Sequence, residues 1–309
     1  MKQRTILIQN YHPPGTQGLI RDFKKIGFRV VAPDSNWGRI SYYAPNDGLG
    51  GELISYEEFV ALPPGYVMIA CKPQEEDFKK LARSGNHGII LNIAQQHHEY
   101  ESGISDIMIC PDIGLYNNYS SHIKHKLLYF PRPFIESIPT KNIETAYYGK
   151  KIYSYINLPH HWPRGSQAFA EFTSKYDGEC EQYGTDASGG ALSHAQCHTK
   201  MAEAFFTVHL KDAEGYGLTC LESMMIGTPV VGLNSLMAGT TLKAFFLDDT
   251  TSILADTIDE LVARIDAITL QDYAAMCKAC ESRVLDLTSD ARTVDKLREA
   301  IEEDESSAA

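Results

Sequence analysis

The sequence predicts an α/β protein made of two successive domains, each a doubly wound parallel sheet. Short, β-rich apolar runs alternate with helical patterns along most of the chain, as expected for parallel strands with helices on both faces. The chain has 309 residues, which is enough for two such domains. Its composition, 43% apolar and 22% charged, is that of an ordinary globular protein and excludes the disordered and fibrous classes.

The first series of elements covers residues 1–148, the expected N-terminal domain. We expect strands at Thr5–Gln9, Phe28–Ala32, Met68–Ala70, Gly88–Ile93, Asp106–Cys110 and Leu127–Phe130. Helices are expected at Leu19–Ile26, where Gly27 follows as a stop signal, and at Gln74–Ser84 and Gly114–His122. Residues 33–66 are rich in glycine and proline and are predicted to form a long loop insertion with a functional role.

The second series covers residues 149–309, the expected C-terminal domain. Strands are predicted at Lys151–Asn157, Glu179–Tyr183, Phe205–Leu210 and Pro229–Leu233. Helices are predicted at Gly165–Lys175, Ala195–Ala204 and Thr219–Ile226, followed by a helical tail from Asp259 to Ile301. Ligands bind at the carboxyl ends of the strands in such sheets, so we expect a cleft between the two domains.

Charge and cysteine content narrow the functional classes. Residues 1–148 carry 15 basic and 15 acidic side chains, whereas residues 149–309 carry 13 basic and 25 acidic ones. The second half is therefore a poor surface for nucleic acid, and the neutral first half remains open to it. Seven scattered cysteines indicate reduced thiols. With no run of about 20 apolar residues and no signal-peptide pattern, we expect a cytoplasmic protein without a membrane partner.

The most informative segment is residues 205–234, a predicted strand, loop, helix and strand. Glu214 lies in the loop and Glu222 in the helix, with seven residues between them. The backbone of Gly215-Tyr216-Gly217-Leu218 leads directly into the helix, whose free N–H groups and positive dipole end favour a phosphate. The alternative for Glu222 is a capping box with Thr219, in which it only closes the start of the helix.

This segment, EGYGLTCLESMMIGTPVV, resembles the E-x7-E signature of retaining GT-B glycosyltransferases. The resemblance implies a GT-B fold, two Rossmann-like domains facing a cleft, and transfer of a sugar from a nucleoside diphosphate with retention of anomeric configuration. It implies that Glu214 contacts the donor sugar and Glu222 the ribose. Gly215, Tyr216, Gly217, Leu218 and Thr219 would meet the diphosphate. Family habit favours a UDP-sugar as substrate, with no bound cofactor and no metal.

The family also carries a basic pair near the diphosphate. Arg164, followed by Gly165, matches its second half at the start of a predicted helix, where a cation is unfavourable unless an anion is present. The earlier arginine of the pair is absent, with Asn157 or His160 near its place. Lys211 is a candidate for the missing charge, and its alternative is a solvated loop lysine.

Weaker candidates lie in the N-terminal half. Gly15 and Gly18 follow the first strand, and by the resemblance their loop lines the donor cleft; the alternative is an ordinary turn. His97 and His98 follow the strand that ends at Ile93, where family members often place a histidine facing the sugar. The alternative for both is surface or packing, and a metal site is not expected because successive side chains point to opposite faces.

The acceptor has the least sequence support. Trp37, Arg39, Tyr42 and Lys124 offer aromatic and basic groups for stacking on and holding nucleic acid. Phage enzymes that glucosylate hydroxymethylated pyrimidines in DNA are also of GT-B type, so a 5-hydroxymethylpyrimidine in DNA is the most specific acceptor hypothesis. The alternatives are a glycan or small-molecule acceptor, a nucleotide-sugar epimerase, and a non-catalytic relative that binds sugar nucleotides.

Overall fold

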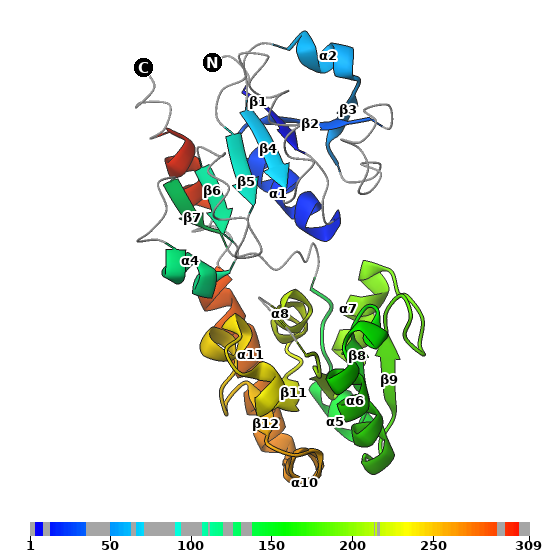
Figure 1. Cartoon of the computed structure of the whole chain (residues 1–309). Coiled ribbons are helices and arrows are strands. Elements are labelled where there is room, and N and C mark those ends of the chain that lie inside the picture. The colour runs from blue at the N-terminus through cyan, green and yellow to red at the C-terminus, as the bar shows by residue number, and fades with distance from the viewer. Residues whose placement is uncertain are drawn as a thin grey trace. The chain divides into compact units, whose positions relative to one another are not determined.

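The computed structural model contains two compact units (Figure 1). It describes residues 4–8, 13–34, 50–62, 66–70, 90–93, 107–110, 112–119, 126–130, 138–212, 214, 217–288 and 294–302. Unit 1 comprises Met1–Phe134 and Thr288–Ala309, and unit 2 comprises Ile135–Leu287. The units thus divide at 134/135, ahead of the expected boundary at 148/149, and the C-terminal residues return to unit 1.

Unit 1 is built on a seven-stranded, fully parallel sheet in the order β3-β2-β1-β4-β5-β6-β7. Its strands are β1 (Thr5–Ile8), β2 (Arg29–Pro33), β3 (Glu52–Ile54), β4 (Tyr66–Ala70), β5 (Ile90–Ile93), β6 (Ile107–Cys110) and β7 (Lys126–Tyr129). Its helices include α1 (Pro13–Lys25), α2 (Tyr56–Val60) and α4 (Ile113–Tyr119). The strand order reverses between β1 and β4, which makes the sheet doubly wound as predicted.

The start of α1 corrects one expectation. The helix begins at Pro13 rather than Leu19, because proline suits the first helical turn, where a backbone N–H has no partner to lose. Gly15 and Gly18 therefore lie inside the helix and not in a loop before it.

The interval 33–66 also contains regular structure that was expected to be loop. β3 pairs in parallel with β2, and Arg29 Nε donates to Glu52 Oε2 at 2.8 Å across the pair. A capping box between Ser55 and Glu58 then starts α2. Tertiary pairing with β2 provides the partner that a three-residue strand needs.

The core of unit 1 explains why the C-terminal residues belong to it. Ile6, Phe23 and Ile109 are buried in one apolar cluster with Leu297 and Ile301. The last two come from the helical residues 294–302, so the chain returns to complete the first domain's core.

Unit 2 is built on a five-stranded parallel sheet in the order β12-β11-β10-β8-β9. Its strands are β8 (Ile152–Tyr155), β9 (Cys180–Tyr183), β10 (Phe206–Val208), β11 (Val230–Leu233) and β12 (Ser252–Ala255). The chain winds outward from β8 to β9, then crosses to β10 and winds the other way. The topological switch point, where doubly wound sheets bind ligands, is thus between β8 and β10.

Helices and short turns connect these strands. They are α5 (Ile143–Gly149), α6 (Pro163–Lys175), α7 (His194–Glu203), α8 (Leu218–Met225), α9 (Asn234–Met237), α10 (Ile258–Ala267), α11 (Leu270–Thr288), a 3₁₀ turn η3 (Pro159–His161) and a π-helical turn η4 (Leu242–Phe246). None of the helices within the described residues has the length and apolarity that crossing a membrane requires.

Candidate functional site

The loops after β8 and β10 meet at the switch point of unit 2. Asp212, after β10, accepts hydrogen bonds from the backbone N–H groups of Arg164 (3.0 Å) and Gly165 (3.2 Å) in the first turn of α6. Nε of Arg164 lies 3.5 Å from the same carboxylate. The anion expected at this helix start is thus present in the structure, and it is a side chain of the protein itself.

Close backbone packing holds these two loops together. Gly165 is buried, and a Cβ built on it would lie 2.3 Å from the carbonyl oxygen of Leu210. Only glycine permits this approach. The start of α6 is therefore positioned by the end of β10.

Glu214 is held by two cationic side chains. Its Oε2 lies 2.9 Å from Nε2 of His209 and 3.2 Å from Nζ of Lys211. Burial alone would raise the pKa of Glu214, but His209 and Lys211 outweigh it and hold the pKa well below its ordinary value. Burial opposes the charge of His209 as well, while Cys220 and Glu214 raise its pKa. At neutral pH the site therefore contains an ionised Glu214.

Lys211 is not a solvated loop lysine. Its side chain is 23% exposed, and besides Glu214 it contacts Trp162, with Nζ 4.9 Å from the centre of the indole ring. Trp162 immediately precedes α6, so Lys211 bridges the loops after β8 and β10.

The N-terminus of α8 begins at Leu218, after Gly217 with φ of 70°. The left-handed backbone conformation favours glycine here, and a Cβ at Gly217 would lie 2.8 Å from Leu242 Cδ2, so any other residue would also have to displace that side chain. The N-cap residue Gly217 makes no side-chain capping hydrogen bond to this helix. The capping box considered for Thr219 and Glu222 is therefore wrong, because the helix starts too early for Glu222 to reach its cap.

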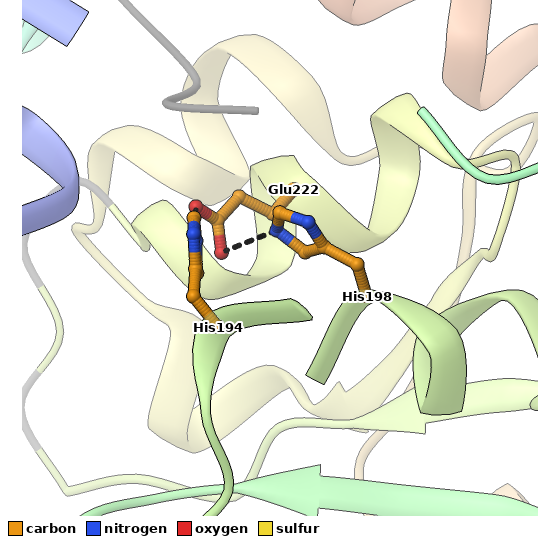
Figure 2. Close-up of side chains that lie close together, drawn as sticks. All are labelled: His194, His198 and Glu222. Carbon is orange, nitrogen blue, oxygen red and sulfur yellow. Dashed lines mark hydrogen bonds and ion pairs between the residues drawn. The ribbon is translucent and has the colours of Figure 1, made fainter. Parts of the chain in front are cut away.

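Glu222 instead points to two histidines of α7 (Figure 2). It is 5% exposed, with Oε1 at 2.9 Å from Nε2 of His194 and Oε2 at 3.8 Å from Nε2 of His198. Burial would raise the pKa of Glu222, and the two histidines more than offset this, so the pKa is lowered. The two imidazole rings lie on either side of the carboxylate.

The structure brings together part of the predicted site. Arg164, Lys211, Glu214, Gly217, Leu218, Thr219 and Glu222 all belong to unit 2, in or beside the loops that follow β8 and β10 and the helices that these loops begin. Several predictions lie outside the described residues, namely those for Trp37, Arg39, Tyr42, His97, His98, Lys124, Gly215 and Tyr216.

Sequence reasoning missed four polar residues of unit 2: His194, His198, His209 and Asp212. Only the first two had a detectable signal, the spacing of four residues that places two side chains on one helix face. His209 and Asp212 acquire partners through the packing of loops, which no local pattern shows.

Comparisons with known proteins support the architecture. No model of a protein family matches the sequence, and no curated protein matches it either. Solved structures of GT-B glycosyltransferases match almost the whole chain, and the chain therefore has the GT-B fold, as the resemblance predicted.

Three of these structures show the extent of the likeness. Sucrose-phosphate synthase from Thermosynechococcus elongatus is 12% identical, with a TM-score of 0.68 over 99% of this chain and 100% of that one. HepE from Anabaena, in complex with UDP-glucose, is 11% identical, with a TM-score of 0.69 over 97% and 99%. The calicheamicin glycosyltransferase CalG4 is 11% identical, with a TM-score of 0.54 over 97% and 98%.

Proposed function

We propose that this protein is a glycosyltransferase that uses a nucleoside-diphosphate sugar, with UDP as the nucleotide. The observation that carries the proposal is the loop and helix after β10. There, the half-buried carboxylate of Glu214 precedes the N-terminus of α8 and the buried carboxylate of Glu222 follows it, while the N-cap residue Gly217 has no side chain to occupy that N-terminus. This helix start follows one of the two strands at the switch point of a doubly wound sheet.

The diphosphate is assigned to the start of α8, beside the side chain of Arg164 at the start of α6, where the backbone N–H groups are already bonded to Asp212. Backbone N–H groups and the positive dipole end of α8 complement a phosphate. Lys211 and Arg164 supply positive charge that can turn toward the diphosphate. The Arg164 side chain is 66% exposed, and Lys211 contacts only one carboxylate oxygen and one aromatic ring among the interactions described above. These contacts stabilise charge on the leaving UDP without a metal ion.

The two carboxylates are assigned different parts of the donor. Glu222 accepts hydrogen bonds from the ribose hydroxyls; a carboxylate offers about four lone-pair sites, so contact with His194 leaves capacity for both. Glu214 contacts the sugar, because it is ionised and lies in the loop that leads into α8. The ion pairs with His209 and Lys211 fix its position.

The proposed reaction forms a bond between an acceptor oxygen and the anomeric carbon, and breaks the bond from that carbon to the diphosphate. The acceptor hydroxyl passes its proton to the departing diphosphate oxygen and UDP leaves, with the anomeric configuration retained. For the acceptor we keep the sequence-based hypothesis of a 5-hydroxymethylpyrimidine in DNA, which rests on Trp37, Arg39, Tyr42 and Lys124. A glycan or a small molecule is the alternative acceptor.

Mass spectrometry with a panel of UDP- and GDP-sugars tests the proposal. Each donor is incubated alone, with duplex DNA containing 5-hydroxymethylcytosine or 5-hydroxymethyluracil, and with oligosaccharides. A sugar mass added to a nucleoside establishes both transfer and the DNA acceptor, and NMR of the product reads the anomeric configuration.

The other outcomes separate the alternatives. Sugar added to an oligosaccharide keeps the transferase and removes DNA. Isomerisation of a donor without acceptor indicates an epimerase. Nucleotide binding without any turnover indicates a non-catalytic relative.

A further inference from the structure

His194, His198 and Glu222 form a compact group of metal-ligand types inside unit 2 (Figure 2). One ligand atom from each residue is available, and the three atoms lie within 4.8 Å of one another. Two of the three side chains, His198 and Glu222, are at least nine-tenths buried. Such a group is far less common in a protein interior than on its surface.

The local sequence explains why the two imidazoles converge. Ser193 and Gln196 form a capping box that fixes the first residue of α7 at His194. His198 then follows one helical turn later on the same face, and the ring centres are 4.1 Å apart. Glu222 reaches them from α8, so the group is held by two helices rather than by a loop.

His198 gives an independent sign that a ligand is expected here. Its Nε2 is buried without a hydrogen-bond partner, and it lies 3.8 Å from Glu222, beyond hydrogen-bond range. A buried imidazole nitrogen with no partner is unfavourable unless something binds it. Within the described part of the chain, His194 and His198 are the ion-pair partners of Glu222, so the carboxylate faces both imidazole rings.

We propose that His194, His198 and Glu222 bind a divalent transition-metal ion of the zinc class. Two imidazole nitrogens and one carboxylate oxygen favour Zn²⁺, Co²⁺ or Ni²⁺ over Mg²⁺, which prefers oxygen ligands. At metal–ligand distances of about 2.1 Å, ligand atoms around a tetrahedral ion stand about 3.4 Å apart. The separations of 2.9 Å and 3.8 Å from Glu222 bracket that value, so small side-chain rotations complete the site.

A bound metal ion also affects binding of the donor, a consequence that rests on the proposed function. Glu222 is also the residue assigned to the ribose. A carboxylate bound to a metal between two imidazoles no longer presents the same oxygens to the hydroxyls. The metal and UDP therefore compete, and zinc acts as an inhibitor of a reaction that itself needs no metal.

Cobalt absorption spectroscopy tests the site directly on the full-length protein. Titration of the metal-free protein with Co²⁺ is expected to produce the visible band of a tetrahedral site, saturating at one ion per chain and abolished by Zn²⁺. His198→Gln and His194→Gln are each expected to weaken binding by roughly 100-fold, because each removes one of three ligands. His161→Gln, which removes an exposed histidine in η3, is the matched control and keeps the band.

Two results overturn the metal site. One is a wild-type protein that gives no saturable band, a result that does not depend on any variant folding. The other is a band that survives in both His194→Gln and His198→Gln, with thermal unfolding confirming that these variants are folded.

Competition is measured separately, so that the two proposals fail independently. UDP binding is first measured by calorimetry without metal, which tests the donor site alone. UDP is then expected to raise the apparent Kd for Co²⁺ by at least about 10-fold at 100 times its own Kd. Tight UDP binding that leaves the Kd for Co²⁺ unchanged contradicts competition at Glu222 while the metal site stands.

Discussion

Nε2 of His209, directly after β10, lies 2.9 Å from Oε2 of Glu214 in the following loop. Lys211 lies 3.2 Å from the same oxygen. These ion pairs link the loop that contains Glu214 to the residues that directly follow β10. The two cationic side chains lower the pKa of Glu214 and keep its carboxylate ionised. The four predictions below concern this carboxylate and the neighbouring loop contacts, and they separate chemical from structural roles.

Glu214→Gln is expected to lower kcat by at least about 100-fold while UDP affinity changes by less than about 3-fold. The amide keeps the shape and one acceptor oxygen, and removes the charge that faces the sugar in the proposed donor complex. Steady-state kinetics and UDP calorimetry measure the two effects. Glu179→Gln is the control, since Glu179 forms an exposed ion pair with Lys151 before β9. A normal rate for Glu214→Gln shows that the site assignment is wrong.

The stability contributed by Glu214 is expected to depend on pH. Because its pKa is lower in the folded protein than in the unfolded chain, the contribution is fully present above the ordinary glutamate pKa of about 4.3. It is lost as the pH falls from there through the lower folded value. Urea unfolding of wild type and Glu214→Gln between about pH 7 and pH 3 measures it. The difference in unfolding free energy should shrink in acid; a constant difference contradicts the ion pairs as its source.

Asp212→Ala is expected to strengthen binding of UDP and inorganic pyrophosphate by about 3- to 10-fold. The change frees the N–H groups of Arg164 and Gly165 and removes a negative charge beside the proposed diphosphate position. It also costs about 1 kcal/mol of stability through loss of the cap. Calorimetry with both ligands provides the measurement.

The control for this change is Asp177→Ala, which removes the same charge from an exposed position after α6. Equal or weaker pyrophosphate binding by Asp212→Ala than by wild type excludes a diphosphate beside the start of α6.

Gly165→Ala is expected to destabilise unit 2 by about 2–4 kcal/mol. The new Cβ would lie 2.3 Å from a backbone oxygen of Leu210, so the loops after β8 and β10 must separate. Gly149→Ala is the matched control, because the nearest atom to its Cβ is a flexible part of Lys151 at 4.0 Å. Urea unfolding measures both. If the two variants are equally stable, the close packing of the loops does not hold the site together.

Most of the strand and helix pattern was predictable because it depends on local periodicity. The expected strand at Lys151–Asn157 is β8, and the expected helix at Gly165–Lys175 is α6 with two further residues at its start. β3 and β12 were not expected. They are three and four residues long and exist because β2 and β11 offer them edges for pairing.

The candidate site was predictable only in part. Glu214 and Glu222 stand in one continuous motif with the glycine loop, so a linear pattern contains them. Asp212 meets the start of α6, and His194 meets Glu222, across 48 and 28 positions of sequence. Such partners depend on which loops leave the same edge of a sheet.

The sequence by itself determined the class of fold, the order of its elements and the pair of acidic residues around a helix N-terminus. These properties follow from hydrophobic periodicity and turn chemistry, which act within a few residues. The tertiary structure alone decided that the chain's last helix completes the first domain and that two histidines flank Glu222. It also decided that Asp212 caps α6. Each of these contacts joins segments that are far apart in the sequence. The connections between parallel strands and the packing of helices bring such segments to one core or one sheet edge.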